Sequence, residues 1–161
     1  MQNTRLDLAD IRILDHLQDH ARASNNELAE VAHLSPSQCH RRVKRLEGQG
    51  IIKGYQALLD PAMVGMEITI FVNISLDAHG PNPAQTFIDA IRDVPEVLEC
   101  YSVTGDTDYL IKATLPSLNA MSQFLMHRLV QVPGVGSIKT SVVVEEIQRK
   151  SKLALESLAL R

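Results

Sequence analysis

The sequence contains no tryptophan, and aromatic residues make up only 4% of its 161 residues. A hydrophobic core must therefore be built from aliphatic side chains and methionine, and a nucleic-acid surface that stacks bases on aromatic rings is disfavoured. No apolar run reaches the ~18 residues that a membrane-spanning helix needs. The N-terminus also lacks the basic and then apolar order of a signal peptide. These absences predict a soluble cytoplasmic protein.

Signals for metal binding and redox chemistry are equally scarce. The chain has two cysteines, Cys39 and Cys100, with no CxxC pair, and both are best interpreted as structural thiols. Its six histidines are scattered. His16 and His20 lie four positions apart on an expected helix, but no thiol or carboxylate pattern accompanies them. We therefore predict neither a metal site nor a bound cofactor.

A large positive charge is absent as well, because the formal net charge is −3. This argues against a uniformly basic nucleic-acid-binding protein. Residues 35–53, however, contain five basic residues and the single acid Glu47, which gives a local charge of +4. A compact basic patch on a neutral or acidic body can direct DNA to one face of a protein.

The basic patch lies on a segment with a complete set of helix signals. Ser35 suits the N-cap, Pro36 suits the first helical position, and Gln38 completes a Ser-x-x-Gln capping box. Gly48 and Gly50 indicate where the helix ends. We therefore predict a short, well-capped helix at this place in the chain.

This predicted helix combines an apolar stripe with a basic outer face. Cys39, Val43 and Leu46 recur at helical spacing and indicate the side that packs on a core. A helix of this kind can lie in a DNA groove, although a solvated surface helix has the same pattern. The residues on the far side are Ser37, Arg41, Lys44 and Arg45.

Two further helices are predicted before the basic one. Apolar residues recur at helical spacing over 6–20, and Asp7 and Asp10 lie in the first turn, where acids suit the helix dipole. Ser24 and Glu27 form a second capping box, which begins a short helix. Helix, short helix, tight turn and basic helix is the order of a helix-turn-helix, whose last element reads the major groove.

We expect the first half of the basic helix to reach base edges and its other cations to reach phosphates. An arginine with two hydrogen bonds to guanine discriminates between bases, whereas phosphate contacts set affinity. The predicted base-reading residues are Ser37, Gln38 and Arg41. The predicted phosphate contacts are Arg42, Lys44, Arg45 and Lys53, and Ser35 at the helix start completes the predicted interface.

The second half of the chain has strand-like periodicity and an internal repeat. Residues 52–59 are predicted to form an extended connector. A Val-Pro-x-Val motif stands between a helix and a strand twice, and its prolines, Pro95 and Pro133, lie 38 positions apart. The repeat predicts a ferredoxin-like β-α-β-β-α-β domain, an antiparallel sheet with both helices on one face. Strands are expected at 67–77, 97–104, 109–114 and 137–147, and helices after Pro83 and Ser117.

The strands are apolar on both sides, most clearly from Val142 to Val144. A partner subunit is therefore predicted to cover the open face of the sheet. Glu145 and Glu146 are expected on a solvated strand edge. The basic tail at 149–152 is expected to be solvated rather than to contact DNA.

One set of residues along the first half carries a family resemblance. The set comprises Leu6, Asp7, Asp10, Ile13, Leu14, Leu17, Leu28, Ala29, Leu34, Ser35, Pro36, Arg41, Arg42, Val43, Leu46, Glu47, Gly50, Ile51 and Ile52. This pattern resembles the N-terminal domain of the Lrp/AsnC (feast/famine) transcriptional regulators. His33 stands where that family usually has glycine, and histidine tolerates a left-handed conformation better than a β-branched residue does.

The resemblance implies an α+β protein in two domains. Residues 1–52 would form a winged-type helix-turn-helix DNA-binding domain and residues 53–65 an extended linker. Residues 66–161 would form a ferredoxin-like domain for effector binding and oligomerisation. The family also implies double-stranded DNA and a small-molecule amino acid as partners, and homodimers that assemble further into octamers or other higher assemblies.

A loop in the second half, Gly105 to Tyr109, combines more polar binding groups than any other segment there. A hairpin loop with two carboxylates, a hydroxyl and backbone amides can bind the ammonium and carboxylate of a free amino acid, although an ordinary acidic turn has the same composition. The loop resembles the Gly-Asp-x-Asp-Tyr effector loop of the family, in which the last strand also contributes. The predicted effector-binding residues are Thr104, Gly105, Asp106, Thr107, Asp108, Tyr109, Ser141, Val142 and Val143.

These patterns predict a sequence-specific transcriptional regulator that responds to an amino acid. Paired catalytic acids at Asp106 and Asp108 are disfavoured because no histidine, lysine or nucleophile lies near them in the sequence. We therefore predict that the protein is not an enzyme. The alternatives are an enzyme resembling sirohaem decarboxylases, which share the two-domain plan without needing a basic third helix, and an architectural DNA-binding protein without an effector.

Overall fold

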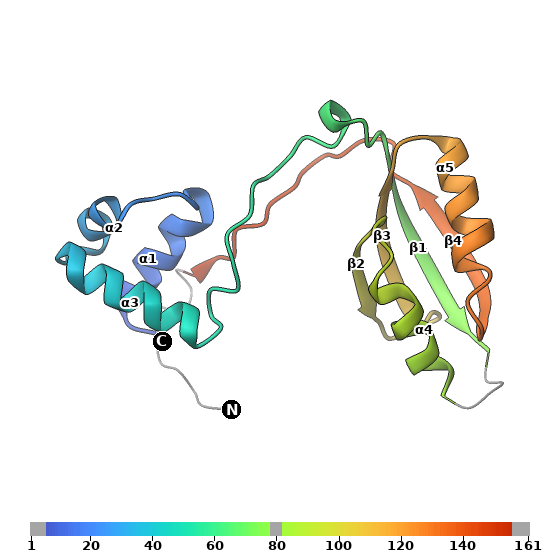
Figure 1. The fold of residues 1–161 in the computed structure, drawn as a ribbon, viewed down its shortest axis with the longest axis horizontal. Helices are drawn as coiled ribbons and strands as arrows, with labels where there is room; N and C mark the ends of the chain where they lie inside the picture. Colours follow the sequence, from blue (N-terminus) through green and yellow to red (C-terminus); the bar gives the residue numbers. More distant parts are fainter. Residues whose placement is uncertain (1–5, 78–81, 156–161) are drawn as a thin grey trace. The chain divides into compact units, whose positions relative to one another are not determined.

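The computed structural model describes residues 6–77 and 82–155. The chain divides into two compact units (Figure 1). One unit consists of residues up to Leu58 together with those from Gln148 onward, and the other runs from Leu59 to Ile147. Within the described ranges, no helix is both long enough and apolar enough to cross a membrane.

The first unit contains three short helices, α1 (Leu8–Asp19), α2 (Asn25–Ala32) and α3 (Pro36–Gly48). The capping boxes predicted at the starts of α2 and α3 are confirmed, because in each one the serine and the third helical residue bond each other's backbone N–H groups. A third capping box at the start of α1 was not foreseen. It is formed by Asp7 and Asp10, which the sequence pattern had assigned only to the helix dipole.

The turn between α2 and α3 depends on His33. This residue lies in the left-handed region, with φ 55° and ψ 50°, and caps the end of α2. Its backbone N–H donates to the carbonyl oxygens of Ala29 and Glu30. Histidine therefore adopts here the conformation that glycine reaches without strain, and the turn delivers the chain to the start of α3.

The core of the first unit is aliphatic, as the scarcity of aromatic residues predicted. Ile13, Leu28, Cys39 and Leu46 are buried at its centre. Cys39 and Leu46 belong to the predicted apolar stripe of α3, and Val43 packs against the same cluster while half-buried. Burying an aliphatic side chain of this size contributes roughly 1.5–3 kcal/mol, so this stripe fixes which face of α3 points outward.

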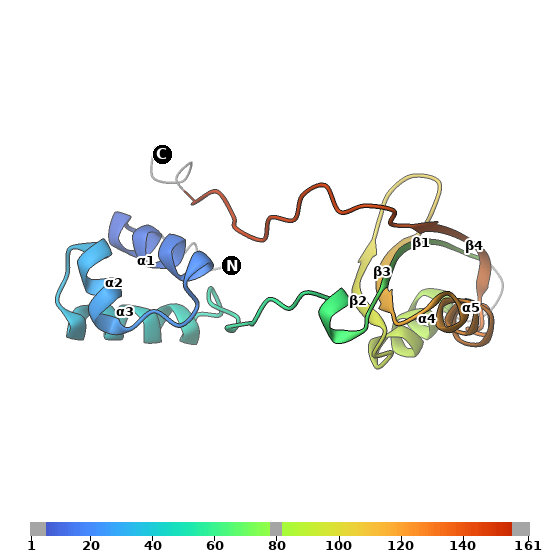
Figure 2. The ribbon, with the colours of Figure 1, turned by 90° about the horizontal axis from the view of Figure 1, so that it is seen from above.

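The second unit is a four-stranded antiparallel sheet with two helices on one face (Figures 1 and 2). The strands lie in the order β2-β3-β1-β4, which confirms the ferredoxin-like topology. A short 3-10 turn at Ala62–Val64 precedes the sheet. In chain order the elements are β1 (Ile68–Leu76), α4 (Pro83–Arg92), β2 (Val97–Ser102), β3 (Tyr109–Leu115), α5 (Leu118–Gln123), a π-helical continuation of α5 (Phe124–Leu129) and β4 (Val135–Val142).

The helix-covered face of this sheet forms the second core. Alternate residues of β1, among them Ile70, Val72 and Ile74, are fully buried on that face, as the period of two predicted. Two aromatic rings close one side of the core, since Phe87 from α4 and Tyr109 from β3 lie with ring centroids 4.5 Å apart. Two of the few aromatic side chains of the chain therefore lie in the core of this domain.

Three sequence-based predictions need correction in this unit. The last strand ends at Val142 rather than at 147, because β1 begins at Ile68 and offers no ladder partner beyond the bond from the Val143 N–H to the Thr69 carbonyl. The second strand likewise ends at Ser102 instead of 104. Cys100 was interpreted as a structural thiol but is exposed, because β2 is an edge strand of the sheet.

Candidate DNA-binding surface and effector loop

The outer face of α3 presents polar and basic side chains to solvent. Ser37, Gln38 and Arg41 are exposed near its first turns, as expected for residues that would reach bases. Gln38 also has a structural task, because its Oε1 accepts a 3.0 Å hydrogen bond from the Ser35 N–H. Its amide NH₂ group is a donor that this bond leaves unused. Gln38 can therefore cap the helix and donate to a ligand at the same time.

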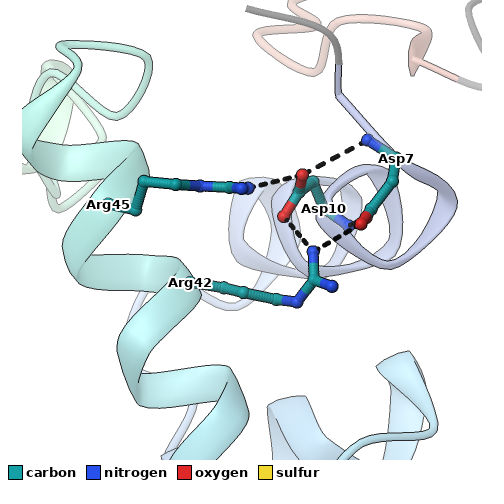
Figure 3. Close-up of polar contacts among 4 residues, drawn as sticks. All are labelled: Asp7, Asp10, Arg42 and Arg45. Atoms are coloured by element: carbon teal, nitrogen blue, oxygen red, sulfur yellow. Dashed lines mark hydrogen bonds and ion pairs between the residues drawn. The ribbon is translucent and has the colours of Figure 1, made fainter.

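Two arginines of α3 are held by a buried carboxylate of α1 (Figure 3). Asp10 is only 1% exposed, and its two oxygens form ion pairs with different guanidinium groups. Arg42 donates through Nη1 to Asp10 Oδ1 at 2.8 Å and to Asp7 Oδ2 at 2.7 Å. Arg45 lies with Nη2 at 2.5 Å from Asp10 Oδ2. This cluster of Asp7, Asp10, Arg42 and Arg45, the α1–α3 ion cluster, joins the start of α1 to α3.

The pKa values of Asp7 and Arg42 favour the charged form of their contact. Hydrogen bonds to Asp7 and Asp10 raise the pKa of Arg42. Burial raises the pKa of Asp7, but the Asp10 N–H and the Arg42 guanidinium outweigh that effect, so the net pKa lies below its usual range. Both groups therefore stay ionised at neutral pH, and the contact between the helices persists.

The α1–α3 ion cluster decides which cations of α3 have acidic partners. Arg42 and Arg45 were predicted to meet phosphates, and the structure gives both of them carboxylate partners within their own domain. Lys44 pairs with Glu47 at 2.9 Å, in a contact that solvent reaches. Across 6–77 and 82–155, Arg41 forms no ion pair, which leaves its five N–H donors available.

The end of α3 is tied to the segment that follows it. Glu47 accepts a 3.0 Å hydrogen bond from the Tyr55 hydroxyl and a 2.9 Å bond from Lys44. The bonds from Lys44 and Tyr55 lower the pKa of Glu47, while burial and the nearby carboxylate raise the pKa of Tyr55. Lys53, a predicted phosphate contact, is exposed on the same connecting segment.

The Gly105 to Tyr109 loop is anchored to the end of β1. Gly105 has φ 116°, a conformation that other residues rarely adopt. Asp108 donates its N–H to the Ile74 carbonyl at 2.9 Å, and its Oδ2 accepts from the Leu76 N–H at 2.7 Å. The carboxylate of Asp108 therefore holds the loop in place, while Asp106 projects as an exposed acid.

The other predicted effector residues do not all lie at this loop. Tyr109 is buried in the sheet core, whereas Thr104 is exposed beside the loop. Ser141 and Val142 pair with Phe71 and Ile70, five residues or more from the Leu76 position that bonds the loop. At about 3.4 Å per residue this is roughly 17 Å along β1. Within one chain the loop and the Ser141–Val143 segment therefore lie near opposite ends of the sheet.

The structure also places the two neighbouring histidines of α1. The rings of His16 and His20 lie with centroids 4.6 Å apart. In the part of the chain that the structure describes, no group of three or more histidine, cysteine or acidic side chains is arranged to hold a metal ion. These rings are accounted for by the helical spacing of the two residues.

A helix-turn-helix domain with an exposed cationic third helix, followed by a ferredoxin-like domain, defines the class of two-domain DNA-binding regulators. Comparison with known families gives the same answer at both ends of the chain. Residues 6–53 match the family model for winged helix-turn-helix DNA-binding domains, and residues 69–153 match that of the Lrp/AsnC ligand-binding domain. The chain belongs to the Lrp/AsnC family of transcriptional regulators.

Individual relatives cover nearly the whole chain. The leucine-responsive regulatory protein of Escherichia coli K12 is 40% identical over 152 residues, which is 94% of this chain and 93% of that protein. A transcriptional regulator from Neisseria meningitidis, solved in complex with L-Met, matches with a TM-score of 0.90 and 40% identity over 95% of this chain and 99% of that one. Escherichia coli AsnC matches with a TM-score of 0.81 and 28% identity over 92% and 99%.

These matches decide between the functions that the sequence left open. The chain is a DNA-binding transcriptional regulator with a ligand-binding domain, and its relatives are regulators rather than enzymes. The alternative of an enzyme resembling sirohaem decarboxylases is therefore set aside.

The ion pairing of Asp10 was missed at the sequence level, although a signal for it was present. Asp7 and Asp10 have the three-residue offset of a capping box, and Arg42 and Arg45 have the same offset on α3. Residues at that offset lie on one face of a helix, so each pair presents two like charges in one direction. Opposite pairs on two helices of one small domain are natural partners.

Proposed function

We propose that this protein binds paired DNA half-sites with α3 in the major groove. The exposed Arg41, which has no acidic partner in the described residues, carries the proposal. Arg41, Ser37 and the free amide of Gln38 read base edges. Lys44 and Lys53 meet phosphates, and the N–H groups of Arg42 and Arg45 that Asp10 leaves unused add to that contact. Ser35 orients the start of the helix through its capping box.

The division between reading and anchoring residues can be measured with selected DNA. A half-site is obtained by in vitro selection from random DNA, and binding is followed by fluorescence anisotropy. Arg41→Ala is expected to lose about 1–3 kcal/mol of preference for the selected bases. Lys44→Ala is expected to weaken binding to all sequences alike and to reduce the salt dependence. Unchanged binding by both variants would show that α3 does not enter the groove.

We propose an amino acid as the effector. The Neisseria relative was solved with L-Met, and several relatives are named leucine-responsive regulatory proteins. In this chain the exposed Asp106 offers a carboxylate for an ammonium group, and the amides of the loop offer donors for a carboxylate. Because Asp108 and Tyr109 have structural partners, their role is to hold the loop in shape.

The effector site is proposed to need a second copy of the chain. The Gly105 to Tyr109 loop and the Ser141–Val143 segment lie near opposite ends of one sheet, so a single chain does not bring them together. A loop of one subunit can face the last strand of another. An effector bound there would favour one assembly over another and so alter DNA binding.

Calorimetry of the full chain with each of the twenty amino acids tests this site. Asp106→Ala is expected to abolish binding without loss of the folded state, whereas Asp108→Ala is expected to lower both affinity and the stability of the sheet domain. The absence of binding below millimolar concentration by every amino acid would contradict the proposal.

We further propose that the open face of the sheet forms the homodimer contact, and that dimers assemble further, up to an octamer. Phe71, Tyr101 and Leu110 point to the face opposite the helices, and Tyr101 is 52% exposed. Apolar side chains on an open sheet face are typical of sheet-to-sheet packing. Light scattering of Phe71→Asp is expected to show a smaller assembly than the wild type. The protein is proposed to work in the cytoplasm, where a bacterial-type regulator meets its DNA.

A further inference from the structure

The last described residues of the chain pack against the DNA-binding domain. Residues from Gln148 onward belong to the same unit as α1, α2 and α3. The side chain of Gln18 forms two hydrogen bonds with the backbone of Leu153. Its Nε2 donates to the Leu153 carbonyl at 3.0 Å, and its Oε1 accepts from the Leu153 N–H at 2.6 Å. One residue of the segment is thus held as a neighbouring β-strand would hold it.

A charged contact and an apolar contact flank this point. Lys152 places Nζ at 2.9 Å from Asp15 and at 2.5 Å from Asp19, which stand four positions apart on α1. The hydrogen bond from Lys152 lowers the pKa of Asp19, and the bonds to Asp19 and Asp15 raise the pKa of Lys152. Leu155 packs on the apolar cluster of the domain, as the partly buried Leu17 does.

The segment also closes one side of a groove in this domain. The groove has a volume of 570 Å³ and is bounded by α1, by the segment after α3 and by the C-terminal residues. Leu14 and Leu17 of α1, Ile51 and Ile52 after α3, and Leu153 and Leu155 of the C-terminal segment are among its lining residues. Without the C-terminal residues, this apolar surface of α1 would lie open to water.

The chain crosses between its two units twice, once after Leu58 and once after Ile147. We propose that residues 148–155 are a releasable strap that gives each DNA-binding domain a second attachment to its regulatory domain. With the strap docked, a pair of DNA-binding domains accepts a narrow range of half-site spacings. With the strap released, each domain is held by one connector and accepts a wider range. This inference rests on the proposed binding to paired half-sites.

The contacts of the strap are suited to release. The Lys152 ion pairs lie at the surface, with the lysine side chain 37% exposed, so salt screens them. Leu153 is 69% exposed and contributes little burial. The strap therefore adds a contact that a change in the regulatory domain can break without unfolding the three helices.

Two readouts on the full chain test the strap. Hydrogen exchange at the Leu153 amide reports docking, because this N–H donates a hydrogen bond to Gln18 only in the docked state. Anisotropy with DNA that carries two selected half-sites, moved apart one base pair at a time, reports the range of spacings. Wild-type affinity is expected to vary about tenfold or more over one helical turn of roughly 10.5 base pairs.

Lys152→Glu is the releasing variant, and Lys150→Glu is its matched control. Both make the same change of charge, but in the described residues Lys150 has no ion pair. Lys152→Glu is expected to speed exchange at Leu153 about tenfold and to reduce the variation with spacing to about threefold or less. Replacing both aspartates with lysine in the Lys152→Glu background is expected to restore both readouts. Gln18→Ala, which removes both backbone bonds, is expected to reduce the variation with spacing as Lys152→Glu does.

Each contrary result has a separate meaning. If exchange at Leu153 stays at the wild-type rate in both variants, the contacts do not hold the strap. If exchange rises but the spacing profile is unchanged, the strap has no effect on DNA binding. A flat wild-type profile would also overturn the strap's role, and a monomer by light scattering would show that paired half-site binding had failed as well.

Discussion

Replacement of Asp10 by asparagine is the sharpest test of how α3 is held. Asp10→Asn preserves the shape of the side chain and an oxygen that can accept from the Asp7 N–H. It removes the negative charge that Arg42 and Arg45 share. One of the two positions that paired with an arginine now carries an NH₂ group, which cannot accept a hydrogen bond.

The expected loss of stability follows from the exposure of the Asp10, Arg42 and Arg45 side chains. Removing one partner from a buried ion pair costs about 3–5 kcal/mol when the remaining charge stays buried. Here Asp10 is 1% exposed, but Arg42 is 24% and Arg45 is 42% exposed. Water therefore recovers part of the hydration of both arginines. We expect the free energy of opening of the helical domain to fall by about 1–3 kcal/mol.

Hydrogen exchange of the full chain in low urea measures this quantity separately for each domain. A single unfolding curve would mix the two units, whereas peptides from α1 and α3 report the helical domain alone. Glu30→Gln, an exposed change of the same chemistry on α2, is the control. A loss below about 0.5 kcal/mol, the range of neutral surface substitutions, would refute the structural role of Asp10.

Asp10→Asn also separates positioning from charge. The substitution removes one negative charge and makes the net charge more positive, so a purely electrostatic account predicts tighter DNA binding. If the α1–α3 ion cluster instead orients α3 for the proposed groove contact, affinity for the selected half-site falls while affinity for random DNA is kept or rises. Anisotropy titrations with both DNAs distinguish these outcomes.

Three further predictions concern pH, a tyrosine and a glycine. The pKa of Asp7 is lowered in the folded state from its ordinary value of 3.8, so its stabilising contribution is present above that value and is lost as pH falls through the folded value. Hydrogen exchange in α1, corrected for the pH dependence of intrinsic amide exchange, should accelerate below about pH 4. A corrected rate that does not change with pH would contradict this. Tyr55→Phe should remove the bond to Glu47 and cost about 0.5–1 kcal/mol in the α3 peptides, without altering base preference; a change in base preference would place Tyr55 at the DNA instead. Gly105→Ala should destabilise the sheet domain by about 1–3 kcal/mol, because alanine rarely adopts its φ of 116°. The added Cβ would meet no atom within 4 Å, so a steric clash does not contribute. An unchanged melting temperature would show that the loop relaxes freely.

Most of the fold was predictable because it depends on short-range patterns. The capping boxes of α2 and α3 join residues three positions apart, and the apolar stripe of α3 repeats within two turns. Alternation along β1 identified its buried face in the same way. The end of β4 was wrong because a strand also needs a paired neighbour, and β1 stops offering one at Thr69.

The candidate DNA-binding surface was predictable in its location but not in its charge pairing. The sequence by itself determined that a capped helix presents basic residues on the side opposite Cys39 and Leu46, because helical periodicity and burial of apolar side chains suffice for that. It did not determine which cations stay free. Only tertiary packing brought Arg42 to an aspartate 32 positions away and left Arg41 without an acidic partner in the described residues.

The same limit applies to the tail and to the effector loop. The basic tail was expected in solvent, yet Lys152 meets acids of α1 and Leu153 bonds Gln18 across 135 positions of sequence. The loop at Gly105 and the strand at Ser141 looked like parts of one site, but strand register separates them within the chain. Caps and periodicity act over a few residues, and so the sequence determined the elements; partners distant in the chain meet only through the packing of those elements, which the tertiary structure decided.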